Sequence, residues 1–437
     1  MSFRTIPNTS IPYNFIVFND KGVERTDDPD GGVFSKALLD KIKSEKPTNI
    51  FLFSHGWKGD VESGIEQYNR WIKAMDDRRA ADPAIGSAIK PMWIGLHWPS
   101  LPWGNEESGS FDPTEGTTLD QLFEETVAHF GGSPEVRAPL RVIFDEYGKD
   151  AGASDVPPRA LDAYKDLAGA IQFGAGQGES AAPDADGAPL DPQAAVDADN
   201  MAAQSFGIGG SIGGGILSGL RQLSFWTMKK RARTVGEGGM HQFIESVQQV
   251  SDAKIHLMGH SFGCVVISGI LNGQNGTGKL PRPIDSVALV QGAFSLWSYA
   301  DTVKDSTSPG YFRSVLQRKV VSGPFITTQS KFDTAVGVLY PAAVGLVREA
   351  DFGVELPKYG AVGSFGIQGT SVASAREMLD TTGNYGFEPG KIYNLESSKF
   401  IAKGGGASGA HSDIDGPQVA HAMWQAALTA SHEEEGV

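Results

Sequence analysis

The clearest chemical signal in the chain is a serine at the apex of a glycine-flanked turn. Ser261 is the central residue of the run GHSFG at 259–263. Apolar residues lie on both sides of this run: Ile255, Leu257, Met258, Val265, Val266 and Ile267. The pattern predicts a strand, a tight turn and a helix, with the serine presented at the turn. A serine hydroxyl becomes an effective nucleophile when a base removes its proton, so Ser261 is the candidate nucleophile.

A second run of the same form, GGSIG at 209–213, places Ser211 at its centre. The chain contains 55 glycines, so a short glycine-serine pattern also arises by chance. Ser211 lies in a glycine-rich tract with no strand pattern before it. We therefore take Ser211 as a coincidental match, and an ordinary turn serine as the alternative for Ser261.

A nucleophilic serine needs a histidine base, and His411 is the candidate. It follows the last predicted strand, 391–395, and a glycine-rich loop at 404–410. The competing histidines are His55, His97, His256, His260 and His421. Three of these, His256, His260 and His421, lie in predicted elements or in the turn itself and are better explained as packing or hydrogen-bonding residues.

The carboxylate that orients the base is predicted to be Asp333. It follows the β-rich run 323–328, and an acid at a strand end can reach a histidine on a neighbouring loop. Asp285, Asp301 and Asp413 are the competing acids, and a solvated turn is the alternative for each.

The oxyanion of an acyl-transfer reaction needs amide donors. The apolar run 49–53 predicts a buried parallel strand that ends at Ser54-His55-Gly56-Trp57. Glycine at this turn lets a backbone amide point into the site. We expect amides near Gly56 and Trp57, together with the amide of Phe262, to form an oxyanion hole.

The order serine, aspartate, histidine along the chain is similar to that of the α/β-hydrolase family of serine esterases and lipases. The resemblance is based on the turn at 259–263, the HGW turn at 55–57, Asp333 and His411, and covers roughly 45–100 and 235–430. It implies a nucleophile role for Ser261, general base and acid for His411, and an orienting role for Asp333. The HGW turn differs from the HGGG run of many lipases. The resemblance therefore does not identify which backbone amide would donate to the oxyanion.

Periodicity predicts an α/β fold in which helices flank a mostly parallel sheet. Further strands are expected at 13–18, 92–96 and 287–290, and helices around 65–75, 243–250 and 415–424. We assign residues 1–100 and 226–437 to one α/β-hydrolase-like core and residues 101–225 to a large insertion.

The insertion has three interpretations. Its glycine-rich tract at 206–217 is a lid or pocket wall, a close-packed pair of small-residue helices, or a segment that touches lipid. We favour the lid or pocket wall. A membrane-spanning helix is not expected here, because Ser, Gln and Arg interrupt the apolar character of this region and Asp and Asn precede it. The basic run 229–233 is expected to be a solvated helix face, and contact with an anionic head group is the alternative.

Composition excludes several classes of protein. The net charge of −15 argues against nucleic-acid binding, which needs a basic face. No run of residues has the complete ligand spacing of a calcium or zinc site, so no metal site and no cofactor are predicted. The single cysteine, Cys264, is expected to pack in the core. No signal peptide or membrane-spanning segment is evident, so the default location is cytoplasmic, with signal-independent export left open. The oligomeric state is not specified.

The expected activity is hydrolysis of a small-molecule or lipid carboxylic ester through an acyl-enzyme intermediate. A thioesterase, amidase or acyltransferase with the same residues is one alternative, and a catalytically silent scaffold that binds a ligand or protein is another. Aromatic residues are expected either to line an apolar acyl pocket or to belong to the core: Trp57, Trp98, Trp103, Phe225 and Trp226.

Overall fold

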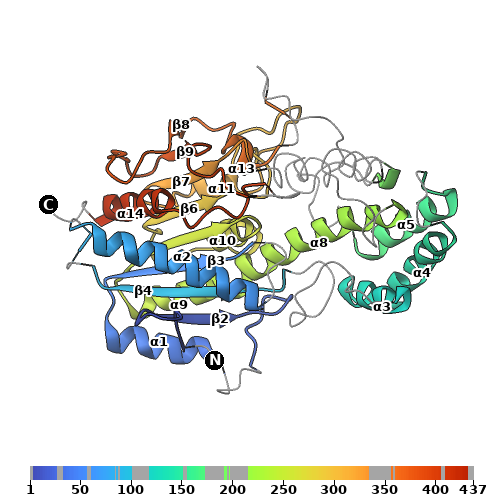
Figure 1. Ribbon diagram of the computed structural model, residues 1–437, viewed down its shortest axis with the longest axis horizontal. Coiled ribbons are helices and arrows are strands. Elements are labelled where there is room, and N and C mark those ends of the chain that lie inside the picture. The colour runs from blue at the N-terminus through green and yellow to red at the C-terminus, as the bar shows by residue number, and fades with distance from the viewer. Residues whose placement is uncertain are drawn as a thin grey trace.

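A sheet forms the centre of the computed structural model (Figure 1). The structure describes residues 3–26, 33–56, 61–83, 85–86, 89–100, 118–150, 155–172, 191–193, 196, 215–333, 356–357, 360–404 and 409–431. Within these residues, nine strands form one sheet in the order β1-β2-β4-β3-β5-β6-β7-β9-β8. The strands are β1 (Phe3–Thr5), β2 (Pro12–Val17), β3 (Asn49–Ser54), β4 (Pro91–His97), β5 (Lys254–His260), β6 (Ser286–Val290), β7 (Phe325–Gln329), β8 (Ala373–Glu377) and β9 (Ile392–Glu396). β1 is antiparallel to β2, and every other pair of neighbours is parallel.

The described helices cover both faces of the sheet or belong to the insertion. They are α1 (Phe34–Glu45), α2 (Val61–Ala81), α3 (Leu119–His129), α4 (Pro134–Lys149), α5 (Pro158–Ala170), α8 (Ser218–Val235), α9 (His241–Val250), α10 (Gly263–Asn272), α11 (Arg313–Gln317), α13 (Val362–Phe365) and α14 (Pro417–Ser431). Short helical turns lie at η1 (Gly215–Leu217), η2 (Gly236–Met240) and η3 (Gln274–Gly276).

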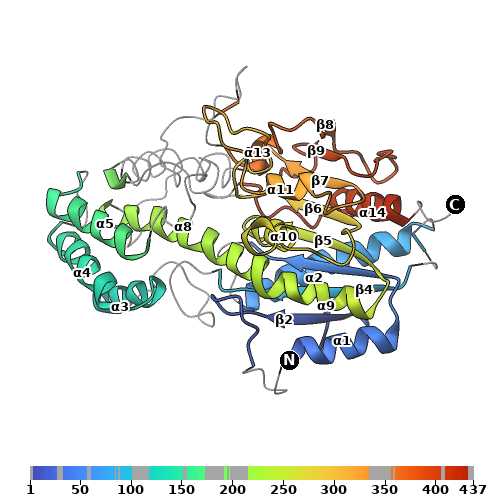
Figure 2. The same ribbon diagram turned by 180° about the vertical axis from the view of Figure 1, so that it is seen from behind.

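The alternation of side chains along each strand divides the core into two layers. In β3, Ile50 and Leu52 pack with α1, α9 and α10, whereas Phe51 and Phe53 pack with α2 and α14. Figure 1 shows α2 and α14 in front of the sheet, and Figure 2 shows α9 and α10 in front of its other face. Because both faces are covered, all six residues of β3 are buried.

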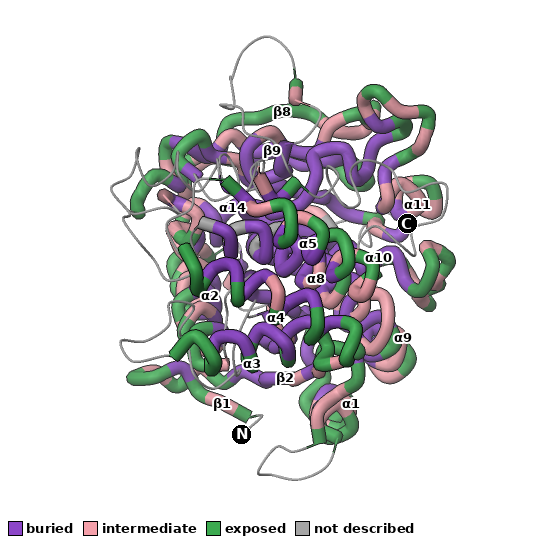
Figure 3. The backbone as a smooth tube through the Cα atoms, turned by 90° about the vertical axis from the view of Figure 1, so that its right-hand side faces the viewer, coloured by how far each residue is buried: buried purple, intermediate pink, exposed green. Residues whose placement is uncertain are grey.

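The insertion has an apolar core of its own. Helices α3, α4 and α5, with η1 and the first turns of α8, bury residues that include Phe123, Phe144 and Tyr164. A capping box starts α3, since the Thr118 hydroxyl accepts from the Gln121 amide at 3.2 Å and the Gln121 side chain accepts from the Thr118 amide at 2.8 Å. These helices extend away from the sheet (Figure 1), and buried and exposed segments alternate along α3 and α4 (Figure 3).

The predicted fold class is confirmed at the level of an α/β protein with a mostly parallel sheet between helices. The strands expected at 13–18, 49–53, 92–96, 287–290, 323–328 and 391–395 correspond to β2, β3, β4, β6, β7 and β9. The boundary between the insertion and the second part of the core was predicted between residues 225 and 226. Helix α8 runs through this boundary without interruption. The glycine-rich run at 206–214, including Ser211, lies outside the described residues.

Candidate active site

Ser261 occupies the turn between β5 and α10, at the carboxyl edge of the sheet. Its φ of +56° is in the left-handed region, which a residue other than glycine adopts at a cost. The two flanking glycines are required by close approaches. A Cβ at Gly259 would lie 2.7 Å from the carbonyl oxygen of Gly263, and a Cβ at Gly263 would collide with the carbonyl oxygens of Ser54 and His55. The turn therefore has the geometry expected from its sequence.

Two main-chain hydrogen bonds fix this turn against the strand beside it. The amide of Ser261 donates to the carbonyl of Val290, the last residue of β6, at 3.1 Å. The carbonyl of Ser261 accepts from the amide of Ala293 at 3.2 Å. Neighbouring backbone thus maintains the unfavourable φ of the serine.

His411 brings Ser261 and Asp333 into one chain of hydrogen bonds. His411 Nε2 lies 2.8 Å from Ser261 Oγ, and His411 Nδ1 lies 2.7 Å from Asp333 Oδ2. The Asp333 side chain is 0% exposed and that of His411 is 13% exposed. In the tautomer that satisfies both contacts, Nδ1–H donates to the carboxylate and Nε2 accepts from the hydroxyl. The structure therefore brings together the three side chains that the sequence proposed, from three separate loops.

Gln291 is a further member of this group that the sequence did not indicate. Its Nε2 donates to Asp333 Oδ2 at 2.7 Å, and its Oε1 accepts from the hydroxyl of Thr328 at 2.9 Å. Gln291 follows β6 directly and has a φ of +49°. A glutamine has no acid–base signature, and its position beside Asp333 depends on the pairing of β6 with β7, so no sequence pattern singles it out.

His260 holds the backbone of the loop that carries His411. Its Nε2–H donates to the carbonyl of His411 at 2.8 Å, and Gln67 Nε2 lies 3.3 Å from its Nδ1. The two imidazole rings lie 4.8 Å apart. Burial, with a smaller contribution from the charge of His411, lowers the pKa of His260 well below its usual value. His260 is therefore a neutral hydrogen-bonding residue.

Gly56 lies against Ser261 on its other side. A Cβ at Gly56 would come within 2.6 Å of the Cβ of Ser261. Phe262 is the residue before α10 and has helical φ and ψ angles of −66° and −21°, so its amide lies at the amino end of that helix. Gly56 and Phe262 therefore flank Ser261, whereas Trp57, the other residue expected at an oxyanion hole, lies outside the described residues.

The turn at Gly56 is supported by a buried pair of histidines. His55 Nε2 lies 3.0 Å from His97 Nδ1, and the amide of His55 donates to the hydroxyl of Tyr68 at 2.8 Å. The ring of Trp98 stacks on that of His55 with an interplanar angle of 9°. Burial, and then the charge of His97, lowers the pKa of His55 to about 3. The pair is structural, because His55 stays neutral.

The other competing histidines and acids lie in local networks. His256 contacts Asn49 and Ser286, and His421 contacts Gly383. Asp285 accepts from the amide of Ile255, Asp301 pairs with Arg313, and Asp413 accepts from the amides of Ala402 and Lys403. These contacts account for each of them without a role at Ser261.

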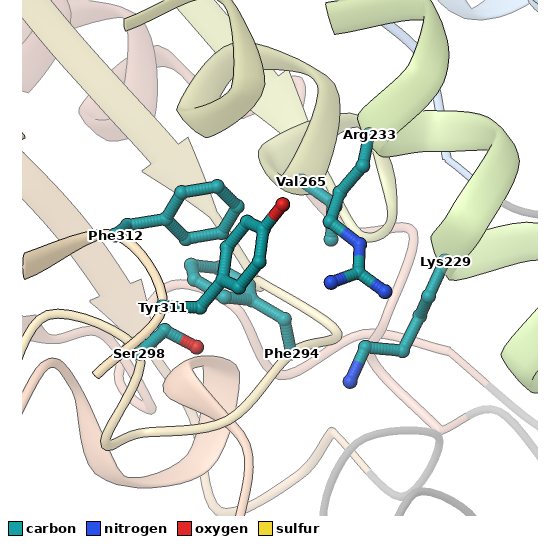
Figure 4. Close-up of a pocket in the computed structure, with 7 residues that line it drawn as sticks. All are labelled: Lys229, Arg233, Val265, Phe294, Ser298, Tyr311 and Phe312. Atoms are coloured by element: carbon teal, nitrogen blue, oxygen red, sulfur yellow. The ribbon is translucent and has the colours of Figure 1, made fainter. Parts of the chain in front are cut away.

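Helix α8 connects the insertion to Phe262, the residue after Ser261. The ring of Phe225 packs edge-on against that of Phe262, with centroids 4.8 Å apart. Trp226 and Trp98 are also buried, and Trp103 lies outside the described residues. The expectation that residues 229–233 form a solvated face is wrong for Lys229 and Arg233, which are 4% and 7% exposed. The Arg233 guanidinium is covered in part by the ring of Tyr311, whose centre lies 4.6 Å away (Figure 4).

Metal ligands do not gather anywhere in the described part of the chain, where no group of three His, Cys, Asp or Glu side chains could hold an ion. Cys264 is buried, and its thiol donates to the carbonyl of Gly259 at 3.2 Å. Among the described helices, none combines the length and apolar character needed to cross a membrane.

Comparison with known proteins identified no relative of this chain. No protein-family model, no curated protein and no solved structure matches the chain.

Proposed function

We propose that the chain is a serine hydrolase of the α/β-hydrolase type that cleaves carboxylic esters through an acyl-enzyme intermediate. The observation that carries this proposal is the continuous chain of hydrogen bonds Ser261–His411–Asp333, at 2.8 Å and 2.7 Å, with the serine at a left-handed turn. Acyl transfer requires a nucleophile that is hydrogen-bonded to a base, and a base that is oriented by a buried carboxylate.

The fold supports the same proposal. Ser261 follows β5 near the middle of the sheet, Asp333 follows β7 and His411 follows β9. Parallel strands end at one edge of a sheet, so side chains far apart in sequence meet there. The helix that begins at Gly263 directs its amino end at the serine, which favours negative charge beside the reacting atoms.

In the acylation step, His411 Nε2 accepts the proton of Ser261 while Oγ attacks the ester carbonyl carbon. The tetrahedral intermediate carries its negative charge on the former carbonyl oxygen. The amide of Phe262 and an amide near Gly56 and Trp57 are proposed to stabilise that charge, typically by about 3 kcal/mol per donor. The Asp333 carboxylate stabilises the imidazolium that forms.

Collapse of the intermediate breaks the bond to the alcohol oxygen, and the His411 imidazolium protonates the departing alcohol. Deacylation repeats the sequence with water. His411 takes a proton from water, the hydroxide oxygen bonds to the acyl carbon, and the same imidazolium returns the proton to Ser261 Oγ as the acid leaves. No cofactor is needed for either half of this reaction.

The insertion is proposed to form a wall or cap beside the acyl group. Its support is the contact between Phe225 on α8 and Phe262, because a displacement of α8 would move the side chain next to the nucleophile. The proposed substrate is a small-molecule or lipid ester. Transient contact with a membrane surface is compatible with a lipid substrate.

A fluorophosphonate probe tests the proposal directly. Purified wild-type protein should be labelled, and Ser261→Ala should abolish labelling. Ser211→Ala is the matched control, because it removes the serine of the other GxSxG run and should leave labelling intact. Absence of labelling in folded wild-type protein, or labelling that survives in Ser261→Ala, would overturn the assignment. A panel of 4-nitrophenyl esters of increasing chain length would then define the acyl preference.

A further inference from the structure

His411 is held at its backbone as well as at its ring, and both contacts come from one turn. The Nε2–H of His260 donates to the main-chain carbonyl of His411 at 2.8 Å. The Oγ of Ser261 lies 2.8 Å from Nε2 of the His411 ring. His260 and Ser261 are consecutive in the chain, so the peptide link between them closes a ring of contacts around the proposed base.

The left-handed backbone of Ser261 lets two consecutive side chains reach the same residue. Along a regular strand, neighbouring side chains point to opposite faces. Strand β5 ends at His260, and the φ of +56° at Ser261 interrupts this alternation. The distance between Ser261 Oγ and His411 Nε2 is therefore set within the turn itself, and not only through the loop that carries His411.

Gln67 fixes the position of the hydrogen on the His260 ring. A carbonyl oxygen only accepts hydrogen bonds, so Nε2 of His260 carries the hydrogen that it donates to His411. Nδ1 of the same ring then has a lone pair, and Gln67 of α2 places its Nε2 3.3 Å from that atom. The Gln67 amide donates to this lone pair and favours the same tautomer. Gln67, His260 and the carbonyl of His411 thus form a second chain of hydrogen bonds, separate from the one through Asp333.

The His260 ring is neutral beside a base that becomes charged during the proposed reaction. The centres of the His260 and His411 rings lie 4.8 Å apart. His260 is 4% exposed, and burial, followed by the charge of His411, lowers its pKa well below the usual value. The charges of His55 and Arg70 lower this pKa further, while the bond to the His411 carbonyl raises it. A second positive charge therefore does not oppose formation of the His411 imidazolium.

We propose that His260 is a positioning residue for the serine hydrolase reaction: it holds the backbone of His411 so that the imidazole meets Ser261 at hydrogen-bonding distance. This inference rests on the proposed function. It gives a role in turnover to a histidine whose contacts packing alone would otherwise explain, and it assigns Gln67 to the support of that histidine. The role is indirect, because His260 acts through His411.

Replacement of His260 by leucine tests the role, because it removes the hydrogen bond to His411 and keeps an apolar side chain in the buried position. We expect kcat for 4-nitrophenyl butyrate to fall about 10- to 100-fold with little change in KM, since misplacement of a reacting group by about 1 Å costs about that much rate. His260→Gln should keep kcat within about threefold of the wild type, because its amide places a donor near the position of Nε2. The proposal is overturned if His260→Leu keeps kcat within about twofold, if it changes KM alone, or if His260→Gln is as impaired as His260→Leu.

His421→Leu is the matched control. His421 is 2% exposed, its Nε2–H donates to the carbonyl of Gly383 at 2.7 Å, and its Nδ1 accepts from Arg78 at 3.3 Å. The same kind of bond is lost, but between α14 and Gly383 instead of at His411. His421→Leu should lower the midpoint of thermal unfolding and leave kcat within about twofold. Equal losses of kcat in the two leucine variants would indicate general destabilisation and overturn the proposal.

Gln67→Met keeps the test available if His260→Leu does not fold. Gln67 is half-buried on α2, and its loss frees His260 to take the tautomer that cannot donate to His411. We expect kcat to fall about 3- to 10-fold, the effect of one hydrogen bond, with KM little changed. An unchanged kcat would count against the second chain of hydrogen bonds.

Proton NMR separates this proposal from the proposed function. The hydrogen between His411 Nδ1 and Asp333 should give a low-field signal that Asp333→Asn removes. His260→Leu should broaden or remove this signal, and His421→Leu should leave it. If the wild type hydrolyses no ester and takes up no fluorophosphonate, but the signal depends on His260, the proposed function fails and the positioning of His411 stands. If the wild type is active, and both the signal and kcat survive in His260→Leu, the positioning proposal fails alone.

Discussion

Replacement of Asp333 by asparagine tests the hydrogen-bonded chain at its buried end. Asp333 Oδ2 accepts two hydrogen bonds at 2.7 Å, one from His411 Nδ1 and one from Gln291 Nε2. A carboxylate can accept both. If the amide nitrogen of the substituted side chain occupies this position, it donates to His411 Nδ1 and selects the tautomer with hydrogen on Nε2. That tautomer cannot accept the proton of Ser261.

The size of the effect follows from the charge and the tautomer together. Two unit charges about 4 Å apart attract by about 4 kcal/mol at an effective dielectric of about 20, which is roughly a thousandfold in rate. The wrong tautomer adds about a further factor of ten. We therefore expect Asp333→Asn to lower kcat about 10³- to 10⁴-fold. KM should change little, because the fully buried side chain has no access to substrate.

The assay is steady-state hydrolysis of 4-nitrophenyl butyrate, with circular dichroism and thermal unfolding to verify the fold. Gln291→Ala is the matched control, since it removes one hydrogen bond from the carboxylate and keeps its charge. It should cost only about tenfold in kcat. If folded Asp333→Asn keeps kcat within about tenfold of the wild type, the carboxylate does not orient the base, and the reasoning from the hydrogen-bonded chain is refuted.

Three other changes probe separate parts of the molecule. Gly56→Ala puts a Cβ 2.6 Å from that of Ser261, so kcat/KM should fall about 100-fold in the same ester assay; a fully active variant would disprove tight contact. Burial, and then the charge of Lys254, lowers the pKa of His256 to about 3. As pH falls, the unfolded chain protonates His256 before the folded protein does. The free energy of unfolding therefore falls by about 1.4 kcal/mol per pH unit as pH drops from about 6.5 toward 3. His256→Gln should reduce this slope in urea titrations between pH 6.5 and 5, and an equal slope in both proteins would count against neutral burial. Burial also raises the pKa of the Cys264 thiol well above its usual value, so iodoacetamide should alkylate it in urea but not in the native protein, as mass spectrometry would report.

The strand, turn and helix around Ser261 could be predicted from the sequence because they depend on local constraints. Strand β5, the turn at Ser261 and helix α10 are encoded by adjacent apolar runs and two glycines that nothing larger could replace. Asp333 and His411 could be proposed from the sequence because residues that follow parallel strands gather at one edge of the sheet. Gln291 could not be proposed, because its contact with Asp333 depends on the pairing of β6 with β7.

Burial of charged residues was harder to predict than the strands. Lys229 and Arg233 look like solvated residues from sequence, but tertiary packing buries both, and in the case of Arg233 the ring of Tyr311 contributes. Edge strand β8 was missed because its residues are mostly exposed and show no apolar alternation. Helix α3 was also missed, although its buried residues Leu122, Phe123, Thr126 and Val127 have helical spacing.

The sheet imposes a delay on folding during synthesis. Asn49 in β3 contacts His256 in β5, 207 positions later in the chain. At roughly 5–20 residues per second, the ribosome needs roughly 10–40 s to make that stretch. Throughout this time β3 has an unpaired edge of apolar character, which is a template for wrong association. The helices of the insertion emerge in the same interval and can complete their own core first. The order of synthesis thus delays the pairing of β3 with β5, and with it the turn at Ser261, until after the helices of the insertion have emerged.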